Sequence, residues 1–146
     1  MAFDAFLQIE GIPGESSFPK HKNEIAIESF SWGMSNRATS LNDFSFVHRV
    51  DKASPPLLTA SCTNMAFPTL KLSLVKVSQK TGSGPDYLVF TMTDCLITGL
   101  ASTGEDSSKP QERLSFNFQK IEMDYKFEKP DGTLSAPIHG ECNPAP

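Results

Sequence analysis

The most regular alternation of apolar and polar residues in the chain lies between Glu112 and Phe127 (ERLSFNFQKIEMDYKF). Its apolar residues occupy even positions first and odd positions afterwards: Leu114, Phe116 and Phe118, then Ile121, Met123, Tyr125 and Phe127. Because side chains alternate with a period of two along a strand, a straight strand cannot place both sets on one face. The stretch would also span about 53 Å if straight, which is too long for a small domain. We therefore expect a bulge at Gln119–Lys120, or a crossing there from one sheet to another.

The same change of phase recurs in three other segments: Glu24–Met34, Thr69–Val77 and Tyr87–Leu100. Repeated changes of phase are typical of long, bent strands that wrap one core, as in a closed barrel or in two sheets that share strands at the corners. Trp32 lies on the apolar phase of the first of these segments, so we expect it in the core. Shorter alternating runs at Phe3–Glu10 and Phe44–Val50 add two more strands.

A single helix is predicted after the strand that ends at Val50. Ser54 can cap its N-terminus, and Pro55 suits the first helical position because that position needs no N–H partner. The side chains expected on its apolar face are Leu57, Leu58, Cys62 and Met65. Asn64 is a suitable C-terminal stop because asparagine tolerates the left-handed conformation.

Turn-forming and polar residues mark the connections between these elements. Ser35–Asp43 (SNRATSLND) is a polar loop, and Thr81–Pro85 (TGSGP) is a turn that joins two strands into a hairpin. The segment from Thr133 is rich in proline, and we expect at most its first half to be ordered. The pattern shows no internal repeat and no domain boundary, so residues 1–146 are predicted to form a single domain with residues 133–146 as a flexible tail.

Charge and hydropathy exclude several function classes. The net charge is −4, which leaves no basic footprint for nucleic acid and no polybasic run for an anionic membrane. No apolar run approaches the roughly 18 residues of a membrane-spanning helix, so membrane insertion is not expected. Met1–Gly11 contains acids and alternates like a strand, unlike a signal peptide. Export, if it occurs, is therefore expected to bypass the general secretory route.

Cysteines and titratable residues offer little chemistry. Three widely spaced cysteines, Cys62, Cys95 and Cys142, argue against a disulfide framework or a zinc site, and we expect two buried residues and one tail thiol. His21 is expected to be solvated in a loop, and His48 to be an exposed or hydrogen-bonded strand residue. Asp94, an acid within a strand, is expected to be buried and paired rather than catalytic. We assign no catalytic, cofactor-binding or metal-binding residue, and this pattern favours a binding or structural role over an enzyme.

Four long stretches, in order over roughly residues 2–138, resemble the Hcp family, the tube protein of bacterial type VI secretion systems. They are AFDAFLQIEGIPGES at the start, EIAIESFSWGMSN with its Ser31-Trp32-Gly33, FSFVHRVDKASPPLL, and Glu112 followed by LSFNFQKIEMDY. The resemblance implies a mainly β fold: a single-domain β-barrel of two antiparallel sheets with one short α-helix on the outside.

The resemblance also implies a function without catalysis or a cofactor. Members of the family form hexameric rings, and the rings stack into a tube that a contractile sheath expels from the cell. The ring channel carries effectors. The implied partners are further copies of the chain and the type VI sheath, spike and effector proteins. The protein would be in the bacterial cytoplasm during assembly, and afterwards in the extracellular medium or in target cells.

Two sets of residues are predicted to serve this assembly. The polar loop between two strands lies at the rim of the expected barrel, so Asn36, Arg37, Asn42 and Asp43 are predicted to contact the next ring or a neighbouring subunit. The channel of such a ring is wet and its lining should be polar. Ser115 and Asn117, on the polar phase of the late strand, are predicted to line it.

Two other functions are compatible with the pattern. A monomeric β-barrel could bind a small apolar ligand with the same Phe-rich strands. An enzyme could use Asp94 and a histidine as an acid–base pair. A ring would have six times the 16.0 kDa mass of the chain, whereas a ligand-binding barrel would have that mass once.

Overall fold

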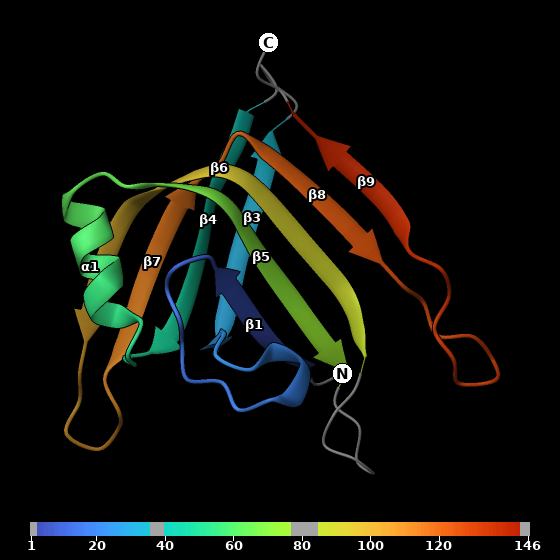
Figure 1. Ribbon diagram of the computed structural model, residues 1–146, viewed down its shortest axis with the longest axis horizontal. Coiled ribbons are helices and arrows are strands. Elements are labelled where there is room, and N and C mark those ends of the chain that lie inside the picture. The colour runs from blue at the N-terminus through green and yellow to red at the C-terminus, as the bar shows by residue number, and fades with distance from the viewer. Residues whose placement is uncertain (1–2, 36–39, 77–84, 144–146) are drawn as a thin grey trace.

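The computed structural model describes residues 3–35, 40–76 and 85–143. Figure 1 shows a strongly curved sheet with one helix at its side. The strands are β1 (Phe3–Ile9), β2 (Ile25–Ile27), β3 (Ser29–Ser35), β4 (Ser40–Arg49), β5 (Ala66–Lys76), β6 (Asp86–Thr103), β7 (Gln111–Asn117), β8 (Lys120–Tyr125) and β9 (Ile138–Cys142). The helices are the short 3-10 turn η1 (Pro19–His21) and α1 (Ser54–Cys62).

The nine strands form one antiparallel sheet, so the expectation of two sheets needs correction. The strand order is β2-β1-β5-β6-β7-β4-β3, and β8 and β9 branch from β6. The sheet is also not closed into a barrel: its end strands β2 and β3 follow each other in the chain, and no ladder between them is found in the described part. Instead, the backbone N–H of Glu28, between them, donates to the Val47 carbonyl of β4 over 2.8 Å. Strand β2 has three residues, and all three pair with β1.

Strand β6 confirms the predicted change of phase and shows how it arises. Its first half pairs with β8, from Leu88 to Thr93, and its second half pairs with β7. Between the halves Asp94 has φ +56°, a left-handed conformation that is uncommon for a residue other than glycine. Opposite it, the late strand breaks into β7 and β8, and the N–H of Gln119 donates to the Thr93 carbonyl over 2.9 Å. Both strands therefore bend at one place, and each switches its buried face there.

The core is made of aromatic and aliphatic side chains on the inner face of the sheet. The largest fully buried apolar ones are Phe44, Phe46, Phe116, Leu7, Ile25, Leu57, Leu70, Leu72, Met92, Leu114 and Val75. Phe46 and Phe116 stack with ring centroids 6.0 Å apart, and Phe67 meets Phe116 edge-on. The interior that an apolar ligand would have to occupy is thus packed ring against ring.

Trp32 is less buried than the sequence predicts. It is half-buried at the margin of the core, and its ring meets Phe90 edge-on with centroids 5.8 Å apart. Strand β3 ends the strand order, so the side chains of β3 have neighbouring strands on one side rather than two.

Helix α1 has a different buried face from the predicted one. Its buried residues are Ser54, Leu57 and Ala60, whereas Leu58, Cys62 and Met65 are exposed. The N-cap is Ala53, so Ser54 is the first helical residue and its hydroxyl accepts the Asp51 N–H over 3.1 Å. Asn64 does take the left-handed conformation after the helix, as expected, with φ +54°.

The proline-rich C-terminal segment is more regular than expected. Strand β9 (Ile138–Cys142) runs past the middle of this segment and pairs with β8 from Ile121–Cys142 to Tyr125–Ile138. In Figure 1 the β8–β9 pair extends away from the rest of the sheet, on the side opposite α1. This pair therefore presents two faces outside the main core.

A glycine in the first loop allows a close approach of two backbones. A Cβ at Gly14 would lie 2.5 Å from the Glu24 carbonyl oxygen and 2.8 Å from the Ile25 Cα. We predict that Gly14→Ala lowers the free energy of unfolding by about 1–3 kcal/mol, because backbone atoms would have to move. Gly104→Ala is the matched control, since a Cβ there meets nothing within 4 Å. Chemical denaturation checks both, and equal midpoints for the two variants would contradict the prediction.

Candidate functional surfaces

A histidine–glutamate pair is buried between β4 and β7. His48 and Glu112 face each other in the strand register, and His48 Nε2 lies 2.8 Å from Glu112 Oε1. Both are on the core side, where His48 is 0% and Glu112 4% exposed. Of the two predicted environments for His48, exposed or hydrogen-bonded, the structure shows the hydrogen-bonded one, with the side chain buried.

Asp51 lies at the other nitrogen of the same imidazole. Among the described residues His48 Nδ1 finds no hydrogen-bond partner, and it is 3.9 Å from Asp51 Oδ1. Asp51 Oδ1 accepts the Ala53 N–H at the start of α1 over 2.9 Å, and burial raises the pKa of its carboxyl. The role that these contacts support is to fix the helix start against the end of β4.

His21 is not solvated, contrary to the sequence prediction. It is buried and stacks on Phe6 with ring centroids 5.0 Å apart. Its Nδ1 lies 3.0 Å from Glu24 and its Nε2 2.6 Å from Asp86. These contacts attach the η1 turn to the beginning of β6, which is a structural role.

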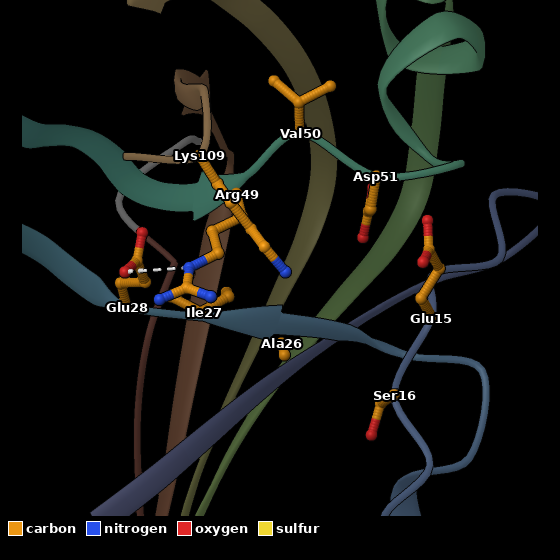
Figure 2. A pocket seen from close by; sticks show the side chains of 9 residues that line it. All are labelled: Glu15, Ser16, Ala26, Ile27, Glu28, Arg49, Val50, Asp51 and Lys109. Carbon is orange, nitrogen blue, oxygen red and sulfur yellow. Dashed lines mark ion pairs between the residues drawn. The ribbon is translucent and has the colours of Figure 1, made fainter. Parts of the chain in front are cut away.

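A pocket of about 410 Å³ lies between β2, the end of β4 and the loop before β7. Figure 2 shows Arg49 and Lys109 on one side, and Glu15 and Asp51 on the other. Arg49 forms an exposed ion pair with Glu28 over 3.8 Å. Opposite charges line the pocket in nearly equal number, so it shows no preference for a ligand of one sign.

Thr98 connects Asp43, a residue predicted to contact the next ring, to Ser115, a residue predicted to line the channel. The Thr98 hydroxyl lies 2.6 Å from Asp43 Oδ2 and 3.0 Å from Ser115 Oγ. Gly99 makes room for this contact, because a Cβ there would lie 2.8 Å from Ser115 Oγ. Asp43 and Ser115 therefore belong to one polar cluster across β4, β6 and β7.

The other predicted site residues are less informative. Asn117 is exposed at the end of β7. Asn42 pairs with Gly33 through its backbone, while Asn36 and Arg37 lie outside the described residues. The structure therefore brings together two of the six predicted residues.

The β8–β9 pair has one apolar and one charged face. Its apolar face contains Met123, Tyr125 and Ile138, which are 38%, 42% and 57% exposed, and Tyr125 lies directly opposite Ile138. On the charged face Glu122 lies opposite Glu141, and Asp124 opposite His139. An apolar face that the chain itself does not cover is a candidate contact surface.

The charged face is held together by side-chain contacts. His139 Nδ1 lies 2.7 Å from Asp124 and its Nε2 3.2 Å from Glu141, and these hydrogen bonds raise the pKa of His139. The Lys120 amine lies 3.2 Å from Glu141. This contact lowers the pKa of the Glu141 carboxyl.

Asp94 and two of the three cysteines, Cys62 and Cys142, differ from their predicted environments, whereas Cys95 is buried as expected. Asp94 is exposed, and its left-handed conformation forms the bend of β6. Each of the three histidines contacts an acid other than Asp94, so the proposed acid–base pair is not assembled. Of the cysteines, Cys95 is buried, and burial raises its pKa to about 12. Cys62 is exposed on α1, and Cys142 is half-buried in β9 rather than in an irregular tail.

Sequence reasoning missed the functional potential of the β8–β9 pair. The apolar phase of Met123 and Tyr125 was visible, but their exposure depends on how far β8 extends beyond the core. The one signal for β9 was the isolated alternation around Ile138–Cys142, which the prolines before it obscured. Within the described segments, no helix has the length and apolar character needed to cross a membrane.

Comparison with known protein families shows similarity in sequence over most of the chain. A family model described as "Type VI secretion system effector, Hcp" matches residues 6–125. Protein hcp1 of Pseudomonas aeruginosa is 30% identical over 147 residues, covering 90% of this chain and 88% of that protein.

Solved structures show the same similarity in three dimensions. The crystal structure of Hcp1 from Salmonella typhimurium superposes with a TM-score of 0.84 at 29% identity, over 98% of this chain and 95% of that one. A type VI secretion system effector from Yersinia pestis gives a TM-score of 0.83 at 32% identity, over 95% and 98% of the two chains.

The buried His48–Glu112 pair yields a prediction about stability. Glu112→Leu alone should cost roughly 3–5 kcal/mol, because it leaves the His48 imidazole buried without its partner. The double variant Glu112→Leu, His48→Phe should lose less than the sum of the two single variants, by roughly 0.5–3 kcal/mol.

Denaturant unfolding measures all three variants. Arg49→Ala is the control: it breaks the exposed pair with Glu28, and its cost should stay within about 1 kcal/mol. Strict additivity of the two single variants would show that the buried pair is not coupled.

Proposed function

Because this chain belongs to the Hcp family of type VI secretion proteins, we propose that it is a ring-forming subunit of the secretion tube and carries effectors in the ring channel. The observation that carries the proposal is the match to the family over residues 6–125, together with a shared fold over nearly the whole chain. In this proposal six copies form a ring, and rings stack into a tube. The other partners are the sheath, spike and effector proteins, and the protein passes from the bacterial cytoplasm to the outside or into target cells.

Exposed apolar residues at two sides of the molecule support ring assembly. A closed ring of identical subunits uses head-to-tail contacts between two different faces. One is the apolar face of β8–β9, with Tyr125 and Ile138. On the other side, at α1, Leu58 and Met65 are 59% and 50% exposed. Figure 1 shows α1 and β9 at opposite ends of the view, as two faces of a head-to-tail contact require.

The polar cluster of β4, β6 and β7 supports a polar channel wall. Ser115 is half-buried and Asn117 exposed on the face of β7 that points away from the core, and we assign both to the channel lining. Many weak hydrogen bonds repeated around a ring would hold a passenger by multivalency and still allow its release. The predicted loop Ser35–Asp43 is shorter than expected, because β3 ends at Ser35 and β4 begins at Ser40, so Asn42 and Asp43 lie in β4. Asn36, Arg37, Asn42 and Asp43 remain the proposed contacts to the next ring or a neighbouring subunit.

The ring proposal predicts a mass and a variant that changes it. The wild-type protein should scatter light as a species of six times 16.0 kDa, or about 96 kDa. Tyr125→Lys should shift it toward the monomer, because a charge would be buried in an apolar contact. Val50→Lys is the matched control, since Val50 is 43% exposed and lies in neither proposed face.

The two possible failures have different meanings. A wild-type mass of 16.0 kDa would contradict the ring. A ring that survives Tyr125→Lys unchanged would keep the ring and remove the β8–β9 face from its contacts.

The channel assignment predicts a separate effect on cargo. Asn117→Trp should abolish co-purification of an effector with the protein while the ring mass stays unchanged, because a bulky side chain would narrow the lumen. Asn143→Trp makes the same change at an exposed residue beyond β9 and should leave co-purification intact. Loss of the ring in Asn117→Trp would place Asn117 in a subunit contact, and unchanged cargo binding would place it in outer solvent.

A further inference from the structure

The charged face of the β8–β9 pair brings three metal-binding side chains together. Glu122 of β8 and His139 and Glu141 of β9 each offer one ligand atom, and the three atoms lie within 4.8 Å of one another. Glu122 lies directly opposite Glu141 in the ladder, and His139 is two residues before Glu141 on the same face. The backbone register of two strands therefore sets the spacing of the donors.

Neighbouring residues orient these donors. Asp124, opposite His139, lies 2.7 Å from its Nδ1 and accepts a hydrogen bond from it, which leaves Nε2 directed at the two glutamates. Nε2 is 3.2 Å from Glu141 Oε1 and 3.8 Å from Glu122 Oε1. A carboxylate on the far nitrogen is the usual support of a metal-bound histidine, because it fixes the tautomer and the ring plane.

Lys120 approaches the same cluster from a different direction. Its amine lies 3.2 Å from Glu141 Oε2, whereas His139 faces the other oxygen, Oε1. It is also 3.9 Å from Glu122 Oε1. Lys120 thus balances part of the negative charge and holds one carboxylate oxygen, while the oxygen that faces the imidazole remains available.

We propose that Glu122, His139 and Glu141 bind a divalent transition-metal ion of the zinc type, which ties strand β9 to β8. One imidazole nitrogen with two carboxylate oxygens suits such an ion, whereas Mg²⁺ and Ca²⁺ prefer oxygen ligands throughout. Three protein ligands leave a fourth position for water or for a donor from another molecule. This proposal is independent of the role of the chain in a tube.

Zinc titration of the intact protein tests the proposal. A Cys62→Ser, Cys142→Ser background removes the exposed and half-buried thiols, which would bind zinc themselves. Calorimetry should show one Zn²⁺ per chain and no comparable binding of Mg²⁺. His139→Ala, Glu122→Gln and Glu141→Gln should each abolish this binding, and Glu105→Gln, an exposed acid in a distant loop, should leave it unchanged.

Two further measurements distinguish zinc coordination by these three residues from non-specific zinc binding. Asp124→Ala should weaken zinc binding roughly 10–100-fold without removing a ligand, since Asp124 orients the imidazole. Hydrogen exchange of the backbone amides in β9 should slow on adding Zn²⁺, and this slowing should be absent in His139→Ala. Absence of zinc binding, binding that persists in His139→Ala, or equal binding of Mg²⁺ would each overturn the proposal.

Discussion

The shared bend of β6 and the late strand is the constraint on which the rest of the fold depends. Strand β6 has β5 on one side and two successive partners, β8 and β7, on the other. This is geometrically possible because Asp94 takes a left-handed conformation where the late strand breaks. Each half of β6 then turns its apolar side chains toward protein: Phe90 and Met92 before the bend, and Cys95 and Ile97 after it. Without the bend, one half would expose its apolar face to solvent.

The same bend separates the part of the sheet around β7 from the β8–β9 extension. The half of β6 that pairs with β7 turns one face to the main core, in which His48 and Glu112 are buried. On its other, outer face Thr98 joins Asp43 to Ser115. The half that pairs with β8 carries the extension with β9, whose apolar and charged faces are available to other molecules. A structural core and a projecting contact element therefore share one strand, so the position of the extension is fixed by the core.

Local alternation predicted the changes of phase, because a period of two makes any switch of buried face visible in the sequence. It located the break near Gln119 and a switch within Tyr87–Leu100, which the structure places at Asp94. Local alternation could not predict the contact between His21 and Asp86, since these residues are 65 positions apart in the sequence and meet only in the fold.

The buried face of α1 was mispredicted because Ala60, a weak apolar signal, packs inward while Leu58 does not. Local periodicity carries no information on which strands pair, so it could not show that the sheet ends at β2 and β3 without closing. For the candidate surfaces, polarity suggested Ser115 and Asp43 as separate site residues, and their contact through Thr98 follows from the strand register, which the sequence does not show.

The attachment of β9 has a consequence for the dynamics of the chain. Its ladder partner in the described part is β8, whereas β1 is held between β2 and β5, with Phe3 opposite Lys76. Opening β9 would break one ladder and uncover few core side chains, so it can separate from the body in a local fluctuation while the remaining strands stay folded. Such a fluctuation would leave the hydrogen-bonding edge of β8 free for a strand from another molecule. Strand β9 can thus act as a replaceable strand, and whatever holds β9 in place also determines how often that edge of β8 is accessible.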